Sequence, residues 1–195
     1  KTYGLPFNFE NITLHNYNYL LYDYGKVMDA LTNSLKLAGG TMLICLVVGT
    51  FIAYLQVRKP SFVSKFLEIV ITIPYTLPGM VLALAMIFAW MQPIPGWNPG
   101  IYGSIWILLI AYVTRFMVLQ VRGSSSAITQ VSTDLEEAAH IFGANTWTKW
   151  RYILFPLILP GVLSGSILVL LTTLTELTIS SLLWSTGAET IGVII

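Results

Sequence analysis

Charge is scarce in this sequence. Its 195 residues include only 10 Lys+Arg and 9 Asp+Glu, so that 10% are charged, whereas an ordinary soluble domain has about 25% charged residues. So few charges cannot cover a surface that faces water. The net charge of +1, without a stripe of positive residues, excludes a nucleic-acid-binding protein, and the 55% hydrophobic residues exclude a disordered chain.

Cysteine and histidine are almost absent. Cys45 is the single cysteine, which allows no internal disulfide. The two histidines, His15 and His140, lie outside the apolar segments, and no close group of His, Asp and Glu resembles a ligand cluster. We therefore expect no metal site in this chain. An intramembrane serine protease is disfavoured too, because no apolar segment contains a histidine base for a serine nucleophile.

Long apolar segments are what the sequence has in abundance. Four of them approach the length that a helix needs, at 1.5 Å per residue, to cross about 30 Å of hydrocarbon: 35–57, 66–91, 104–121 and 156–178. They lack the alternating pattern of barrel strands, and a helix satisfies its own backbone hydrogen bonds in lipid. The predicted fold class is therefore all-α, a polytopic transmembrane helical bundle.

The remaining segments complete the predicted organisation. Residues 1–34 are polar and aromatic and form a lead-in, and an apolar run from about 190 would begin a fifth span. The sequence starts at Lys1 without the charged start and apolar centre of a signal peptide. We expect the chain to be a fragment of a longer protein, with four complete spans.

Lysine and arginine in the connections predict the orientation, because cytoplasmic loops carry an excess of them. The first connection and the third, at 122–155, carry positive residues, whereas 92–103 carries none. The positive residues are Arg58, Lys59 and Lys65 in the first, and Arg122, Lys149 and Arg151 in the third. We therefore expect 58–65 and 122–155 in the cytoplasm and 1–34 outside, as an extracytoplasmic lead-in.

Proline and glycine interrupt two of the spans. Pro74 and Pro78 lie in the second, where proline removes a backbone donor. Gly161 and Gly165 lie in the fourth, at a spacing that lets another helix approach closely. We expect these spans to pack on each other rather than to act as plain anchors.

The third connection is too long for a simple turn. Thr133 and Glu136 have the spacing of a capping box, and Gly143 suits the end of a helix. A short helix is therefore expected from about Asp134 to Phe142. Asn145 can cap a second helix that continues into the fourth span. The prediction is a helix, a sharp glycine turn and another helix on the cytoplasmic face.

A set of residues at fixed spacing runs through this connection. It consists of Glu137, Ala138, Ala139, Gly143, Ile153 and Pro156. The set resembles the EAA motif of permeases in binding-protein-dependent ABC importers, which have the type I importer fold. The family usually ends the motif with Ile-x-Leu-Pro, and here Phe155 replaces the leucine, which keeps an apolar residue. The resemblance implies that this loop forms a coupling helix that docks into a groove on an ATPase.

Further segments extend the resemblance over most of the chain. They are Asn33-Ser34-Leu35, Ile52-Ala53-Tyr54, Ile73 to Gly79 and Glu176 to Leu183. These segments are similar to ferric iron permeases of the family, and relatives for spermidine/putrescine, phosphonate, sulfate and molybdate share parts of the pattern. The resemblance implies a permease transmembrane domain over 35–195 that passes ferric iron, with polyamine, phosphonate, sulfate or molybdate as alternative substrates.

The resemblance also implies the partners. They are ABC ATPase subunits, an extracytoplasmic substrate-binding protein and a second permease copy, fused or separate, in the lipid bilayer of the bacterial inner membrane. No nucleic acid is among them. This chain would bind no cofactor, because ATP and Mg²⁺ belong to the ATPase. The sequence agrees, since it has no Gly-x-x-x-x-Gly-Lys-Ser/Thr motif and needs a separate ATPase rather than being an enzyme itself.

Two ionisable residues are candidates for a substrate path, because a charge at membrane depth is costly. Arg115 lies in the third span, and Glu176 lies near the outer end of the fourth. At 1.5 Å per residue, Glu176 would lie roughly 30 Å along a helix that starts near Pro156. We expect the Glu176 carboxylate to attract a cation at the outer mouth or, alternatively, to hydrogen-bond a neighbouring helix or the loop after it.

One rival class remains open. An ion-coupled secondary transporter or channel would also explain a span interrupted at Pro74 and Pro78, but it leaves the EAA spacing unexplained. An ATPase that co-purifies with the protein would separate the importer from this class.

Overall fold

The computed structural model describes Asn18, residues 25–92 and residues 100–194. Every regular element in this part of the chain is a helix, and no strand occurs in it, which confirms the predicted all-α fold class. Most of the lead-in at 1–34 and of the connection at 92–103 lies outside the described residues.

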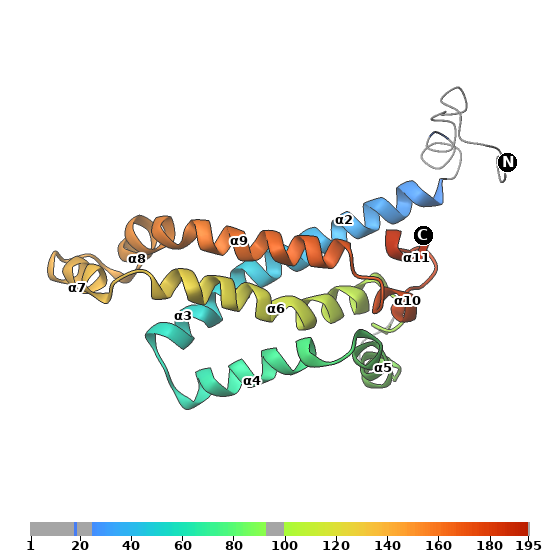
Figure 1. Cartoon of the computed structure of the whole chain (residues 1–195), viewed down its shortest axis with the longest axis horizontal. Helices are drawn as coiled ribbons and strands as arrows, with labels where there is room; N and C mark the ends of the chain where they lie inside the picture. Colours follow the sequence, from blue (N-terminus) through green and yellow to red (C-terminus); the bar gives the residue numbers. More distant parts are fainter. Residues whose placement is uncertain (1–17, 19–24, 93–99, 195) are drawn as a thin grey trace, which may run out of the picture.

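The first membrane helix is continuous from Lys26 to Arg58. It comprises α2 (Lys26–Ile44), the π-helical segment η3 (Cys45–Gly49) and α3 (Thr50–Arg58). Its 33 residues include the predicted span 35–57 and additional turns at the N-terminal side. These turns carry α2 beyond the end of the neighbouring helices (Figure 1).

The second predicted span, 66–91, consists of two helices rather than one. They are α4 (Phe62–Thr76) and α5 (Gly79–Trp90). The two axes differ by 112°, so that the pair is either a broken span or a re-entrant loop. Pro78 explains the break, because a proline has no N–H to donate and keeps the preceding Leu77 in an extended conformation.

Helices α6 (Ile105–Thr129) and α9 (Phe155–Leu174) lie side by side in the centre of the bundle (Figure 1). Small residues allow the close approach: a Cβ on Gly123 would lie 3.0 Å from the Gly165 Cα. The predicted close helix contact at Gly165 is therefore confirmed.

A buried amide joins three helices at this contact. Gln120 is 0% exposed, donates from Nε2 to the Val162 carbonyl at 3.1 Å and accepts from the Ser166 hydroxyl at 2.9 Å. Gly49 of η3 packs against the same side chain, since a Cβ there would lie 2.8 Å from the Gln120 Cγ. Nothing in the local sequence marks Gln120, because its partners lie 42 and 46 residues away.

Helix length and composition allow three membrane spans in the described residues, or four if the bent pair counts as one. The three are Lys26–Arg58, Ile105–Thr129 and Thr146–Leu174, of which the last comprises α8 (Thr146–Lys149), η4 (Trp150–Leu154) and α9. α6 runs beyond the predicted end at 121. In this extension, Thr129 Oγ1 donates to the Ser125 carbonyl of the same helix at 2.8 Å. The Ser124 hydroxyl instead lies 3.1 Å from Thr50 Oγ1 of α3, in a contact between helices.

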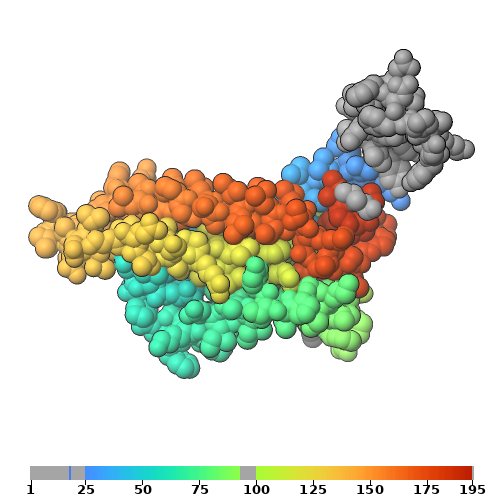
Figure 2. Space-filling model, viewed as in Figure 1, coloured from blue at the N-terminus to red at the C-terminus, as the bar shows by residue number. Residues whose placement is uncertain are grey.

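The two ends of the bundle carry different elements. One end holds α8, α7 (Thr133–Ile141) and the connection from α3 to α4, whereas the other holds α5, α10 (Ser180–Leu183) and α11 (Ile191–Ile194) (Figure 1). In the space-filling view, α9 and α6 cover most of the visible face and α4 forms its lower edge (Figure 2). The connections predicted to be cytoplasmic share the first end, which is called the inner end below; the opposite end is the outer end.

Candidate functional site

The connection between α6 and α9 forms the predicted helix, turn and second helix. α7 begins after Ser132, whose hydroxyl accepts a hydrogen bond from the Asp134 N–H at 3.1 Å. The capping box predicted from Thr133 and Glu136 is therefore wrong, because Ser132 is the N-cap. Glu136 does not bond back to the helix start, since its carboxylate binds two cationic side chains instead.

The turn after α7 has the backbone conformation expected of it. Gly143 has a φ of +81°, in the left-handed region, and its N–H donates to the His140 carbonyl at 3.0 Å. Asn145 then caps α8, because its Oδ1 accepts from the Thr148 N–H at 2.8 Å. The predicted glycine turn and the Asn145 cap are both confirmed.

The EAA residues on α7 face different surroundings. Glu137 is exposed, Ala138 is half-buried and Ala139 is buried. The carbonyls of the two alanines accept hydrogen bonds from the N–H groups of Phe142 and Ala144, at 3.0 and 2.9 Å, and these bonds end the helix. One edge of α7 therefore packs inward on small side chains and leaves the Glu137 carboxylate in the open.

The last two motif residues lie where the loop enters the membrane helix. Ile153 is half-buried in η4, and Pro156 is exposed in the first turn of α9. η4 and α9 continue one another, so that α8 and the membrane helix are one continuous element. A displacement of α8 would therefore move α9 directly.

A charged cluster fixes α7 to the bundle. The Glu136 carboxylate accepts from Arg58 Nε at 2.6 Å and from Lys149 Nζ at 2.9 Å. The side chains of Arg58, Glu136 and Lys149 are only 12%, 11% and 21% exposed, so that both ion pairs are shielded from water. The sequence did not predict this pairing, because Arg58 lies 78 residues before Glu136.

Large apolar side chains lie open on the same loop. Ile141, Phe142 and Trp147 are 82%, 89% and 70% exposed. They follow the exposed Glu137 within ten residues and belong to α7, α8 and the turn between them, at the inner end (Figure 1). An apolar surface with a charged neighbour is typical of a contact with another protein.

Glu176 lies just after α9, not within it as predicted. The helix ends at Leu174, and the Glu176 Oε1 accepts hydrogen bonds from the Ile179 N–H at 3.0 Å and from the Thr178 hydroxyl. The carboxylate thus stabilises the loop that follows, as the alternative prediction for Glu176 proposed. Its Oε2 has no hydrogen-bond partner among the described residues.

Arg115 and Glu176 are connected through the break between α4 and α5. Arg115 Nη1 donates to the Leu77 carbonyl at 3.0 Å, which satisfies an acceptor that the break leaves free. Gly79, two residues later, packs against the loop after α9, since a Cβ there would overlap Thr178 and lie 3.5 Å from the Glu176 Oε1. No hydrogen bond or ion pair joins Arg115 directly to Glu176 in the described part of the chain.

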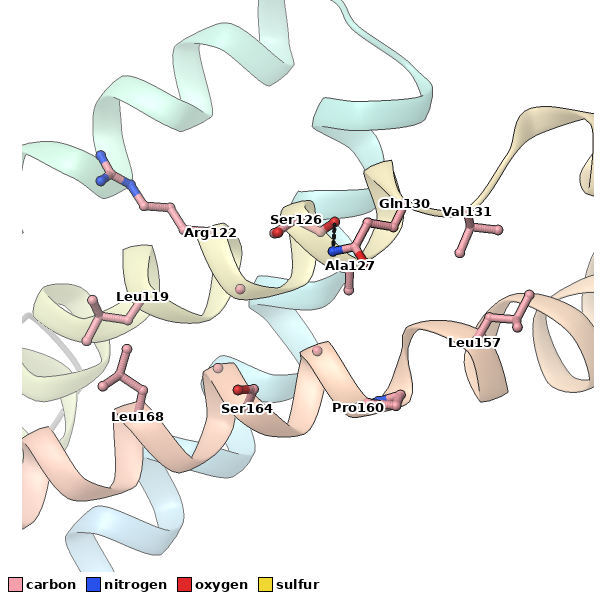
Figure 3. A pocket seen from close by; sticks show the side chains of 13 residues that line it. Leu119, Arg122, Ser126, Ala127, Gln130, Val131, Leu157, Pro160, Ser164 and Leu168 are labelled. Atoms are coloured by element: carbon pink, nitrogen blue, oxygen red, sulfur yellow. Dashed lines mark hydrogen bonds between the residues drawn. The ribbon is translucent and has the colours of Figure 1, made fainter.

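A groove of about 700 Å³ follows the contact of α6 and α9 (Figure 3). Its lining is rich in small and polar residues, among them Ser126, Gln130 and Ser164. Gln130 Nε2 donates to the Ser126 carbonyl at 3.2 Å within α6, and Arg122 extends away from α9 (Figure 3). The central helices therefore present a surface that the described residues leave uncovered.

Metal-ligating side chains do not gather in the described ranges. No group of three His, Cys, Asp or Glu residues there could hold a metal ion. Cys45 is buried in the first membrane helix and His140 is exposed on α7, whereas His15 lies outside the described residues.

Comparison with known proteins identifies the class to which this architecture belongs. A family model described as "Binding-protein-dependent transport system inner membrane component" matches residues 45–194. The match covers most of the chain, so the chain belongs to this family, the permeases of binding-protein-dependent ABC importers. The family description names a transport component of the inner membrane.

Curated relatives include permeases with different named substrates. The Fe(3+)-transport system permease protein FbpB 2 of Haemophilus influenzae is 23% identical over 171 residues, or 88% of this chain and 33% of that protein. The putative 2-aminoethylphosphonate transport system permease protein PhnV of Salmonella typhimurium is 27% identical over 172 residues, or 88% and 63%. The putrescine transport system permease protein PotI of Escherichia coli K12 is 28% identical over 174 residues, or 87% and 60%. The chain thus spans between 33% and 63% of the length of these relatives.

Proposed function

We propose that this protein is the membrane-spanning permease, or one half of the permease, of an ATP-driven ABC importer. An extracytoplasmic binding protein delivers the substrate, which passes between this chain and a second permease copy, fused or separate. ABC ATPase subunits, with their ATP and Mg²⁺, bind at the inner end and supply the energy. The family membership and the loop between α6 and α9 support this proposal.

The form of that loop is the observation that carries the proposal. A short helix, a left-handed glycine and a second helix project from the inner end of the bundle, and the second helix continues into α9. A protein that binds at the inner end and displaces the loop can therefore displace the membrane helix α9 directly. A secondary transporter or channel has no need of such a loop.

Each EAA residue has a role in the proposed coupling. Glu137 offers an exposed carboxylate to the ATPase, and the small Ala138 and Ala139 allow α7 to lie close to its neighbours. Gly143 makes the turn. Ile153 and Pro156 lie where the movement of the loop enters the membrane helix.

Glu176 and Arg115 are the residues that we assign to the substrate path. The Glu176 Oε2 has no hydrogen-bond partner in the described residues and lies at the outer end, where a released cation would arrive. Arg115 acts by holding the Leu77 carbonyl, and hence the broken helix that packs against the Glu176 loop. The bend between α4 and α5 is then the element that changes when the path opens.

Ferric iron is the substrate that we propose. A carboxylate at the outer mouth favours a cation over phosphonate, sulfate or molybdate. FbpB 2 is named for Fe(3+) transport. PotI is named for putrescine, which is also a cation, so a polyamine is the second candidate. Selection between the two cations belongs to the binding protein.

The substrate proposal can be tested with the full-length permease, its ATPase and its binding protein in proteoliposomes. Uptake of radiolabelled Fe(3+), putrescine and 2-aminoethylphosphonate is measured separately with ATP on the ATPase side. We expect ATP-dependent uptake of Fe(3+) alone. ATP-dependent uptake of putrescine or 2-aminoethylphosphonate instead of Fe(3+) would refute iron as the substrate. It would still agree with the proposal that the protein is an importer permease.

A further inference from the structure

The cluster of Arg58, Glu136 and Lys149 joins three separate segments at the inner end. Arg58 is the last residue of α3, Glu136 lies in α7, and Lys149 ends α8. Glu136 uses both carboxylate oxygens, one for each cation. Two charge-assisted bonds to one carboxylate fix its side chain far more firmly than a single exposed ion pair does.

Arg58 has a second partner that extends the cluster to α6. Its Nη2 donates to the Val131 carbonyl at 2.6 Å, in the short segment between α6 and α7. One guanidinium group therefore binds the backbone before α7 and a side chain on α7. The planar fork of arginine suits such a double contact, and lysine would not reproduce it.

The two adjacent glutamates on α7 have opposite surroundings. Glu136 is shielded and bonded to Arg58 and Lys149, whereas Glu137 is exposed and forms no ion pair within the described ranges. Glu137 is thus available to a partner protein, and Glu136 is not. This division shows that α7 has a face directed to the bundle as well as a face directed outward.

The first membrane helix carries this attachment to the outer end. It is unbroken from Lys26 to Arg58, and about 25 residues separate Asn33 from Arg58, which corresponds to roughly 37 Å at 1.5 Å per residue. Asn33 Nδ2 donates to the carbonyls of Gly187 and Glu189 at 3.1 Å each. Ser34 Oγ accepts from the Ile191 N–H at 2.9 Å. The same helix is therefore bonded to α7 at one end and to the outer segment 187–191 at the other.

We propose that Arg58, Glu136 and Lys149 are positioning residues that fasten the coupling helix α7 to the inner end of the first membrane helix, so that the two move as one body. The first helix then transmits the movement of the loop to segment 187–191, in parallel with α9. This inference rests on the proposed function, because it assigns a mechanical role within the coupling of ATP hydrolysis to transport.

A reversible cross-link tests whether α7 and α3 move together. The pair Arg58→Cys/Glu136→Cys is placed in a full-length permease whose native cysteines, Cys45 included, are replaced. It is assembled with its ATPase and binding protein in proteoliposomes and treated with a short, reducible bifunctional thiol reagent. We expect the untreated pair to transport roughly fivefold or more slowly than the cysteine-free parent, within the range of coupling between contacting residues. The cross-link should restore most of that loss, and reduction should abolish the gain.

Two results would overturn the proposal. One is wild-type transport by the untreated pair, and the other is a cross-linked permease that stops transporting, because α7 and α3 must then separate during the cycle. Failure of the cysteine-free parent to take up substrate with ATP would instead refute the proposed importer function.

Charge variants separate positioning from folding. Glu136→Gln should lower transport while membrane levels and co-purification of the ATPase stay unchanged, and Glu136→Asp, which keeps the negative charge, should lower transport less. The matched control Lys59→Gln removes an exposed charge next to the cluster and should transport normally. Loss of Glu136→Gln from the membrane would show a role in folding only and would overturn the positioning role.

Discussion

Gly161 of α9 packs against Ala127 of α6 so closely that a Cβ on the glycine would overlap the alanine methyl group. The backbone of α6 lies nearby as well, with the Gly123 carbonyl 3.7 Å from that Cβ position. Neither atom belongs to a flexible side chain that could turn away. The central pair of membrane helices therefore depends on the absence of a single carbon atom.

We predict that Gly161→Ala destabilises the permease by about 1–3 kcal/mol, the usual cost of overpacking a well-packed contact. The measurement is thermal unfolding of the full-length protein in detergent, in which the midpoint should fall. Gly39→Ala is the matched control, because a Cβ on Gly39 meets nothing within 4 Å. An equal midpoint for the two variants would show that α6 and α9 are not held at this distance.

Gly143→Val should uncouple ATP hydrolysis from transport by disturbing the turn between α7 and α8. Its φ of +81° is strained for any side chain, and a β-branched residue can scarcely adopt it. We expect the permease to remain in the membrane while transport and transport-stimulated ATP hydrolysis fall at least tenfold, which is about 1.4 kcal/mol. Gly143→Asn is the control, since asparagine tolerates the left-handed region and should keep most activity. Normal uptake by the valine variant would remove the main support for the loop's role.

Glu176→Gln separates charge from hydrogen bonding at the outer end. The amide keeps an oxygen that can accept from the Thr178 hydroxyl and the Ile179 N–H, so that the thermal midpoint should not change. Transport should fall because the charge that attracts the cation is gone. Glu176→Ala should lose both transport and stability. If Glu176→Gln transports at the wild-type rate and affinity, the carboxylate is structural and the path assignment is wrong.

The orientation that the positive connections predict can be measured with single cysteines. An impermeant thiol reagent added to intact cells should label a cysteine at Asn98 and should not label one at Gln130, which lies exposed at the end of α6. Labelling of Gln130 should require an opened membrane. Labelling of both positions from outside would contradict the orientation.

Local chemistry explains which parts of the fold could be predicted from the sequence. The length of the apolar segments gave the membrane helices, Pro78 marked the break, and Gly143 and Asn145 defined the turn between α7 and α8. Each of these signals acts within a few residues of the structure that it determines. The end of α6 was missed because serines usually favour turns, whereas Ser124 here hydrogen-bonds Thr50 of α3 across a helix contact.

Contacts between distant segments explain what could not be predicted. Glu136 looked like a capping residue, and only the folded chain brings Arg58 and Lys149 to it. Glu176 was placed in a helix by counting residues, whereas its hydrogen bonds to the next loop place it after the helix end. Gln120 gave no signal at all, because its role depends on α9.

The central claim is that ATP hydrolysis drives transport through the loop between α6 and α9. The most direct measurement is substrate uptake into proteoliposomes that contain the full-length permease, its ATPase and its binding protein, with ATP, with a non-hydrolysable ATP analogue, or with an ion gradient alone. We predict uptake with ATP only, and its loss in the Gly143→Val variant while the ATPase remains bound. Uptake driven by the ion gradient without ATP would contradict the account and would identify a secondary transporter instead.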